Sequence, residues 1–315
     1  MILNPFAMKV VLFGLGQWSK KSWLPILATL SRWGAIDLTV VDRWPTAPAE
    51  LSDLIRDEVC TYLPWENCFE AGVARPWNVA FVITSADAQF DVTSCLVKHC
   101  PNLRVIVCEK PCGASLEEAN AMSEVCRRAQ VMLVMADHYL LRPPIQHLIA
   151  FPNMLSSIGE IVSIRAALNE LKSAGPNQGV TADLMIHLID LLFALFPDAG
   201  FVPSAACIAR VQEHAHTTEE TYSFCCGSLL IPGRPAIRCE LECGKQIKAD
   251  RKELHIVGKD GELHLDLYKN SLTFKNPVDS GEEYFKWTHE WSYARLVLWC
   301  LSLNSPATVS SQPTQ

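Results

Sequence analysis

The first part of the chain alternates short apolar runs with longer stretches in which apolar residues recur every three or four positions. The runs predict buried strands, and the stretches between them predict amphipathic helices. Such alternation is typical of βαβ units, whose strands lie parallel in one sheet. Ser115 and Glu118 form a capping box that starts the third helix. The predicted strands are 9–13, 37–41, 79–84, 104–108 and 131–136, and the predicted helices are 20–32, 88–98 and 115–128.

After Pro143 the pattern becomes one of alternating apolar and polar residues, with one strongly helical stretch among them. Alternation predicts strands with one buried face, and hairpin-joined strands form an antiparallel sheet. Lys259, Asp260 and Gly261 predict a tight hairpin turn, because Asp-Gly tolerates the positive φ that such turns require. The predicted strands are 161–168, 205–212, 222–231, 237–243, 253–257 and 262–267.

Both patterns together predict an α/β protein of two domains. A chain of 315 residues that is 49% hydrophobic is long enough for two sizeable cores. The two prolines after Arg142 are expected to break any continuing helix, so the boundary is placed there. Residues 1–142 are predicted to form a doubly wound parallel sheet, and residues 143–315 an α/β domain on a mostly antiparallel, open sheet.

The charge balance narrows the class of partner. There are 27 Lys and Arg against 34 Asp and Glu, a formal net charge of −7. Nucleic acid is excluded as an expected partner, because phosphate binding needs a concentrated positive face. No apolar stretch reaches the roughly 18–20 residues that span a bilayer, so we expect a cytoplasmic protein without membrane contact.

The 13 cysteines are an odd number and lack the spacing of a zinc site or of a secreted disulfide framework. They are expected to be reduced thiols that act as small apolar residues. His214 and His216 are spaced as metal ligands can be, yet they lie among glutamates in a polar segment that favours a solvated loop. The sequence therefore predicts no metal site.

Gly14 and Gly16 follow the first strand directly, in the pattern Gly-x-Gly-x-x-Ser that ends at Ser19. Gly14 permits a sharp turn, Gly16 lets the backbone approach a pyrophosphate, and the helix that follows offers free amides to it. Gln17 and Trp18 complete this loop, and Trp18 is placed to cover a bound cofactor. A glycine turn in another doubly wound fold remains the alternative.

Asp42 ends the second strand, at the interval where an acid accepts hydrogen bonds from an adenosine ribose. This spacing strengthens the prediction of a dinucleotide site. A carboxylate repels a 2′-phosphate, which favours NAD. The adjacent Arg43 stacks on adenine in one interpretation and grips that phosphate in the other, so NADP stays open.

Glu109, Lys110 and Pro111 end a buried strand at the carboxyl edge of the predicted sheet, where ligands of such folds bind. A charged pair there is costly unless it faces a cleft. At this point the chain resembles the glucose–fructose oxidoreductase and inositol dehydrogenase family, whose hallmark is Glu-Lys-Pro. The resemblance runs from about Lys9 to Phe274. It also rests on Thr84 and Ser85, which match the loop that touches the nicotinamide half, on Asp137-His138-Tyr139 after the last parallel strand, and on an Asp-x-x-x-His helix at Asp183 and His187.

Asp183 and His187 lie four positions apart in a segment of helical period, so both are expected on one helix face. Histidine, with an ordinary pKa near ~6.5, suits a proton transfer in either direction. The resemblance implies that Lys110 polarises the substrate oxygen, that His187 is the acid or base, and that Asp183 holds substrate or tunes His187. Glu109 and Lys110 are also expected at the cofactor. His138, Tyr139 and Arg142 are expected to line the substrate pocket; alternatively His187 is a core histidine and His138-Tyr139 merely closes the sheet.

The resemblance implies hydride transfer between NAD(P) and a secondary alcohol or ketone of a sugar, sugar derivative or cyclitol. It also implies a homodimer or homotetramer joined through the open sheets. Two alternatives stay open: an NADPH-dependent imine reductase of a biosynthetic pathway, and a non-catalytic NAD-binding sensor or scaffold. The second rests on two departures, Ser85 in place of the family's proline and a chain that ends soon after Trp299, where relatives usually add a helix returning to the first domain.

Overall fold

The computed structural model describes residues 7–70, 73–170, 179–214, 217–245, 251–286 and 289–303. The chain divides into two compact units, Met1–Ala136 with His289–Gln315, and Asp137–Thr288. This division lies close to the predicted boundary at residue 142. It differs in assigning residues 137–142 to the second unit and the end of the chain to the first.

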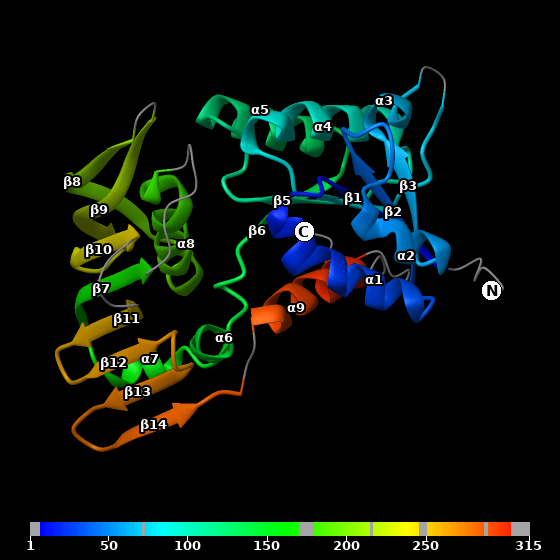
Figure 1. Ribbon diagram of the computed structural model, residues 1–315. Coiled ribbons are helices and arrows are strands. Elements are labelled where there is room, and N and C mark those ends of the chain that lie inside the picture. The colour runs from blue at the N-terminus through cyan, green and yellow to red at the C-terminus, as the bar shows by residue number, and fades with distance from the viewer. Residues whose placement is uncertain are drawn as a thin grey trace. The chain divides into compact units, whose positions relative to one another are not determined.

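The first unit is built on a six-stranded parallel sheet in the order β3-β2-β1-β4-β5-β6 (Figure 1). The strand order reverses between β1 and β4, which makes the carboxyl ends of these strands the ligand-binding edge of a doubly wound fold. The predicted fold class is thereby confirmed. The strand β3 was not predicted, because at the sheet edge only one of its residues is buried and no apolar run marks it. The strands are β1 (Met8–Phe13), β2 (Ile36–Asp42), β3 (Cys60–Pro64), β4 (Val79–Val82), β5 (Val105–Glu109) and β6 (Met132–Ala136).

Helices cover both faces of this sheet, with α4 and α5 on one face and α1 and α9 on the other (Figure 1). The capping box is present, since Ser115 Oγ accepts a hydrogen bond from the amide of Glu118 at 3.2 Å. The bounds are η1 (Ser19–Trp23, π-helical), α1 (Leu24–Arg32), η2 (Ala49–Leu51), α2 (Ser52–Arg56), α3 (Trp65–Cys68), α4 (Ala86–His99), α5 (Leu116–Arg128) and α9 (His289–Ser302).

The helix α9 belongs to the first unit and was not predicted from the sequence. Its buried residues Tyr293, Val297 and Cys300 recur at helical spacing and form one apolar face. The ring of Tyr293 meets that of Trp23 edge-on at 4.9 Å between centroids. The expected departure after Trp299 stays a prediction.

The second unit is built on an eight-stranded sheet in the order β14-β13-β12-β11-β7-β10-β9-β8. Of its described pairings, that between β7 and β10 is parallel and the others are antiparallel, so the predicted mostly antiparallel sheet is confirmed. The strands are β7 (Ile161–Glu170), β8 (Gly200–His214), β9 (Thr217–Leu230), β10 (Ile237–Lys245), β11 (Arg251–Gly258), β12 (Glu262–Asp266), β13 (Ser271–Lys275) and β14 (Ser280–Tyr284).

The prolines at 143 and 144 begin a helix instead of only breaking one. Proline suits the first helical turn, where its missing N–H has no partner to lose, and Arg142 takes the N-cap position of α6. The helices of this unit are α6 (Pro143–Ala150), α7 (Asn153–Ser157), η3 (Thr181–Met185, π-helical) and α8 (Ile186–Leu195).

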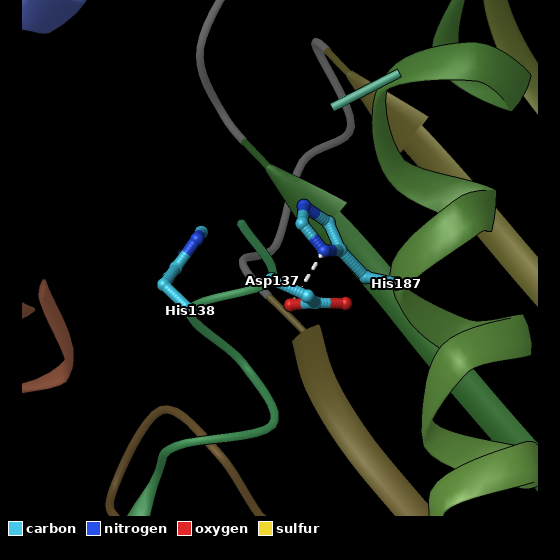
Figure 2. Close-up of side chains that lie close together, drawn as sticks. All are labelled: Asp137, His138 and His187. Carbon is cyan, nitrogen blue, oxygen red and sulfur yellow. Dashed lines mark ion pairs between the residues drawn. The ribbon is translucent and has the colours of Figure 1, made fainter. Parts of the chain in front are cut away.

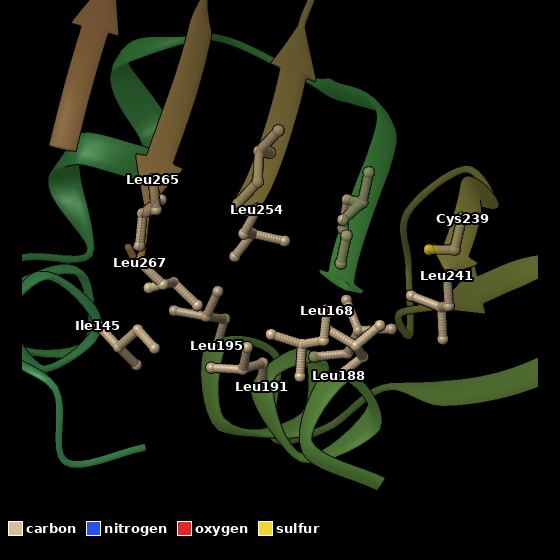
Figure 3. Packing of buried hydrophobic residues seen from close by; sticks show 14 of the residues in the cluster. Ile145, Leu168, Leu188, Leu191, Leu195, Cys239, Leu241, Leu254, Leu265 and Leu267 are labelled. Atoms are coloured by element: carbon tan, nitrogen blue, oxygen red, sulfur yellow. The ribbon is translucent and has the colours of Figure 1, made fainter. Parts of the chain in front are cut away.

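The core of the second unit lies between α8 and one face of the sheet (Figure 3). Leu188 and Leu191 of α8 meet side chains from several strands, among them Leu241 and Leu265, and all four are inaccessible to solvent. The alternating apolar residues of β10 and β12 therefore pack against this helix. They do not supply an apolar surface for a second copy of the chain.

The opposite face of the sheet carries charges that pair across strands. Arg165 Nε lies 2.9 Å from Glu240 Oε2, and His255 Nε2 lies 3.0 Å from Glu262 Oε2. The pattern that motivated the predicted dimer or tetramer thus has another explanation. The oligomeric state itself stays a prediction, which sedimentation at micromolar concentration tests.

The hairpin between β11 and β12 forms where it was predicted, but for a different reason. The amide of Gly258 donates to the carbonyl of Gly261 at 2.8 Å, and neither Asp260 nor Gly261 has a positive φ. Instead, a Cβ on Gly261 would lie 2.3 Å from the backbone oxygen of Lys275. Glycine is needed there for close backbone approach.

We predict that Gly261→Ala lowers the free energy of unfolding by about 1–3 kcal/mol, because the neighbouring backbone must move to admit the methyl group. Gly200→Ala is the matched control, since no heavy atom lies within 4 Å of the Cβ it would add. Urea denaturation followed by circular dichroism compares them. Equal stability of the two variants would contradict the close-approach explanation.

Candidate functional site

A pocket of about 570 Å³ opens at the carboxyl ends of β1, β2 and β4. Gly14 has a φ of +91°, and a Cβ there would lie 2.5 Å from the carbonyl oxygen of Ile83, so only glycine fits this turn. Six of the residues predicted for cofactor binding line the pocket, namely Gly14, Gly16, Asp42, Arg43, Thr84 and Ser85. A glycine turn beside an open pocket fits a bound dinucleotide.

The carboxylate of Asp42 is held rigidly at the end of β2. Its Oδ2 accepts a hydrogen bond from the amide of Leu15 at 2.5 Å, and its Oδ1 accepts one from the amide of Arg43 at 2.7 Å. The guanidinium of Arg43 stacks over Trp44 at 5.0 Å from the ring centroid. The acid therefore ties the glycine loop to β2 and keeps a negative charge in the pocket.

Gln17, Trp18 and Ser19 do not line this pocket. Gln17 is exposed, and Ser19 is fully buried at the start of η1. The indole N–H of Trp18 donates to Glu109 Oε1 at 2.7 Å. This bond connects Trp18 to the end of β5, and its expected role as a cover for the cofactor stays a prediction.

Glu109 is buried and receives two indoles on one oxygen, that of Trp18 and that of Trp23 at 2.8 Å. Burial raises the pKa of its carboxyl group, and the two indole donors partly oppose that rise. Glu109 thus joins the glycine loop, η1 and the end of β5. Its side chain is engaged within the protein, which makes it a scaffold for its neighbour Lys110.

The segment that carries Lys110 is fixed at both ends by one buried side chain. Gln89 donates from Nε2 to the carbonyl of Glu109 at 2.9 Å and accepts from the amide of Gly113 at 2.8 Å. Lys110 lies between these anchors and is half-buried. Sequence reasoning did not give Gln89 this role; the available signal was a polar residue on the buried face of α4.

In the second unit, His187 and Asp137 form a buried pair (Figure 2). His187 Nδ1 lies 2.9 Å from Asp137 Oδ1, and the two side chains are 1% and 2% exposed. Asp137 Oδ1 also accepts a hydrogen bond from the amide of Tyr139 at 2.8 Å. Both ring nitrogens of His187 are buried, and among the described residues neither forms a hydrogen bond, although Nδ1 lies within ion-pair distance of Asp137. This arrangement gives the imidazole a carboxylate on one side.

Asp183 lies in the π-helical turn Thr181–Met185 and forms an ion pair with Lys245. Its predicted role beside His187 stays a prediction. The carboxylate that pairs with His187 is that of Asp137. Its position directly after β6 was the signal available in the sequence.

Aromatic rings surround the pair. The ring of His187 lies 4.6 Å from that of Tyr139 and 5.3 Å from that of His138, centroid to centroid. Tyr139 Oη accepts a hydrogen bond from Lys252 Nζ at 3.2 Å. Of the residues predicted for the substrate pocket, His138, Tyr139 and His187 therefore lie together.

Arg142 has a structural role within this unit. It is buried, donates from Nη1 to the carbonyl of Leu267, and stacks over Tyr139 at 4.4 Å. Its predicted role in substrate binding is left untested.

Asp137, His138 and His187 each offer a metal-ligating atom, and these atoms lie within 4.8 Å of one another. The prediction of no metal therefore stays a prediction. For His214 and His216, the expected solvated loop concerns side chains outside the described residues. In the described part of the chain, no helix has the length and apolar character needed to cross a bilayer.

The fold and the pocket define a dinucleotide-binding α/β protein, and comparison with known proteins names its family. Residues 8–138 match the model of the oxidoreductase family with an NAD-binding Rossmann fold, the glucose–fructose oxidoreductase and inositol dehydrogenase family. This part of the chain matches the family's model, so the predicted resemblance and the NAD-type cofactor are confirmed.

Solved structures share the fold of nearly the whole chain at low sequence identity. UDP-N-acetylglucosamine 3-dehydrogenase GnnA from Acidithiobacillus ferrooxidans has a TM-score of 0.71 and 18% identity, covering 98% of this chain and 91% of that one. Levoglucosan dehydrogenase with NADH and levoglucosan has 0.75 and 13%, covering 94% and 89%. A super-repressor mutant of Gal80p from Saccharomyces cerevisiae has 0.76 and 16%, covering 98% and 86%.

Asp190 adds a second carboxyl group beside Asp137. Burial, followed by the charge of Asp137 and a hydrogen bond to it, raises the pKa of Asp190 from 3.8 to about 7. Below that pH the protonated Asp190 donates to Asp137, which stays available to His187. Asp137 and Asp190 therefore share one proton below this pH.

We predict that Asp190→Asn stabilises the protein, increasingly as the pH rises from 4 to 8. An acid whose folded pKa exceeds its unfolded value favours folding fully below the unfolded value and loses that contribution as the pH passes the folded one, about 7. Asparagine keeps a donor for Asp137 without the charge. After discounting for partial solvent screening, we expect about 1–2 kcal/mol at pH 8.

The measurement is thermal unfolding of both proteins across this pH range, with Asp198→Asn as the control. A stability difference for Asp190→Asn that stays constant with pH would refute the shared proton.

Proposed function

We propose that this protein is an NAD(P)-dependent oxidoreductase that moves hydride between the nicotinamide and a secondary alcohol or ketone of a sugar-type substrate. The observation that carries the proposal is the buried Asp137–His187 pair with its unpartnered Nε2. It occurs in a chain whose first unit matches the model of an NAD-binding oxidoreductase family. Such a pair is what proton transfer to or from a substrate hydroxyl requires.

The nicotinamide, when bound, accepts or donates the hydride. The chain's own task is the proton: His187 Nε2 takes it from the substrate hydroxyl in oxidation and returns it in reduction. Asp137 positions the ring through Nδ1 and stabilises the imidazolium once it forms. Below its raised pKa of about 7, Asp190 is protonated and keeps the second carboxyl group uncharged.

The substrate class rests on chemistry and on fold neighbours. His138 and Tyr139 bring a ring nitrogen and an aromatic face beside His187, a set of groups that suits a small polyhydroxylated molecule. Two neighbours, GnnA and levoglucosan dehydrogenase, are named as dehydrogenases of sugar compounds. A sugar, sugar derivative or cyclitol is accordingly the class we propose.

A second candidate is a non-catalytic NAD-binding sensor. The observation in its favour is the fold shared with Gal80p, whose structure is that of a super-repressor mutant. The buried pair of Asp137 and His187 argues against a sensor. Removing both groups from water costs free energy, and a protein that transfers no proton gains no activity from that cost. Turnover with any polyol in the presence of NAD or NADP decides between the two.

We predict that His187→Gln and Asp137→Asn each lower kcat by about 10²-fold or more while NAD binding stays unchanged. Asp137 acts through His187, so its loss affects kcat more than KM, and Asp137→Glu restores part of the activity. The assay follows NADH absorbance over a panel of sugars, sugar phosphates and cyclitols. His264→Gln, on the charged face of the sheet, is the control.

The expectation that Lys110 serves the same substrate oxygen stays a prediction. A double-mutant cycle with Lys110→Met and His187→Gln tests it, because two groups that act on one transition state are strongly non-additive. Independent, additive effects on kcat/KM would contradict a shared oxygen. Unchanged turnover in every single variant would remove the proposed mechanism.

Cofactor preference is predicted from Asp42. Asp42→Ser is expected to weaken NAD binding by about tenfold, the effect of losing one good hydrogen bond to the ribose. It is also expected to strengthen NADP binding, since the repelling charge is gone and Arg43 remains. Calorimetric titration of both dinucleotides measures this, with the exposed Asp53→Asn as control. A parallel change in both affinities would contradict the assignment of Asp42 as the selecting residue.

A further inference from the structure

Two cysteine thiols flank the segment that carries Lys110. Cys108 lies in β5, Cys112 follows Pro111, and the two thiols are hydrogen-bonded to each other. Both are free thiols, and both pack with Cys126 of α5 in the core beside the parallel sheet. The family match and the dehydrogenase chemistry assign no role to this pair.

The two thiols differ in accessibility and in acidity. Cys108 is inaccessible to solvent, and the hydrogen bond with Cys112, together with burial, raises its pKa. Cys112 is partly exposed, and its pKa is lowered because the Cys108 thiol donates to its sulfur. Burial raises the pKa of Cys126 to about 11 and that of Cys100 to about 12. Cys112 therefore has the features of an attacking thiolate, with Cys108 in contact as a resolving partner.

We propose that Cys108 and Cys112 are a peroxide-sensitive dithiol, which oxidises reversibly to a disulfide that closes around Glu109, Lys110 and Pro111. The oxidant is a hydroperoxide. The reductant that restores the pair is a small-molecule or protein dithiol.

The chemistry balances with hydrogen peroxide as the co-reactant. The Cys112 thiolate attacks one peroxide oxygen, the O–O bond breaks, and hydroxide leaves and takes up a proton to become water. This step oxidises Cys112 to a sulfenic acid. Cys108 then loses its proton and attacks the Cys112 sulfur, the S–O bond breaks, and a second water leaves. Two thiols and one peroxide give one disulfide and two waters.

The fold determines which residues must move when this disulfide forms. Cys108 is held by the ladders that pair β5 with β4 and β6, so it has little freedom to move. Gln89 holds the carbonyl of Glu109 and the amide of Gly113. Drawing the two sulfurs from hydrogen-bonding to covalent separation must therefore displace residues 110–112. Catalytic groups tolerate displacements of only about 0.5 Å, so Lys110 leaves its working position.

The test treats the full-length protein with hydrogen peroxide, alkylates the remaining thiols and maps them by mass spectrometry. Residues 105–127 form one tryptic peptide that carries Cys108, Cys112 and Cys126, and fragmentation locates the link. We expect loss of two alkylation sites at Cys108 and Cys112, with a peptide lighter by two hydrogens and full reversal by dithiothreitol. Cys112→Ser abolishes this change, and the matched variant Cys126→Ser retains it.

Oxidation of Cys112 to a sulfinic acid without a link to Cys108 would overturn the proposal, and so would a disulfide that forms equally in Cys112→Ser. The mass measurement needs no substrate, so its failure is distinct from failure of the proposed function. The consequence for Lys110 does rest on that function. There we expect at least a tenfold loss of turnover on oxidation, recovered on reduction and absent in Cys112→Ser; turnover unaffected by a proven disulfide would refute the displacement of Lys110.

Discussion

The structure depends on how acidic side chains are accommodated at the carboxyl ends of buried parallel strands. Asp42 ends β2, Glu109 ends β5 and Asp137 follows β6. An ionised carboxylate removed from water is costly unless donors surround it. Asp42 accepts hydrogen bonds from two backbone amides, and Glu109 accepts them from two indoles. Asp137 accepts one from a backbone amide and forms an ion pair with the imidazole of His187. Each acid therefore fixes a neighbouring segment: the glycine loop, the segment with Lys110, or the histidine ring.

The same constraint distinguishes acidic residues that only hold the structure together from those that can bind a ligand or take part in proton transfer. Asp42 is satisfied by backbone and still borders the open pocket, so it can meet a ribose. Glu109 accepts the indoles of Trp18 and Trp23 on one carboxylate oxygen, which ties it to the protein's own side chains. Asp137 lies beside Asp190, whose proton prevents two neighbouring negative charges from coexisting below a pH of about 7. Only the last arrangement leaves a proton-carrying group with an unpartnered nitrogen beside it, which is why the proposed chemistry is centred on His187.

Much of the fold follows from the sequence, because buried strands and amphipathic helices carry strong periodic signals. The parallel strands, the antiparallel sheet and the capping box at Ser115 are present as predicted. The edge strand β3 and the helix α9 were missed, since edge strands bury little and α9 packs mainly through Tyr293 and its neighbours. The hairpin at Gly261 was predicted from φ, whereas its actual requirement is the backbone of Lys275, which lies on another strand and leaves no local signal.

The candidate site shows the limit of spacing arguments most clearly. The spacing of Asp183 and His187 suggested that these two side chains act together, but it could not predict that Asp183 pairs with Lys245 of β10 or that Asp137 pairs with His187. Likewise, Trp18 lies within the glycine loop in sequence, but the bond that decides its position comes from Glu109, far along the chain. Motifs identify which residues are available for chemistry. Their partners depend on strand register and on which buried polar groups lie within hydrogen-bonding reach. The pairing of Asp137 with His187 could therefore be found only in three dimensions.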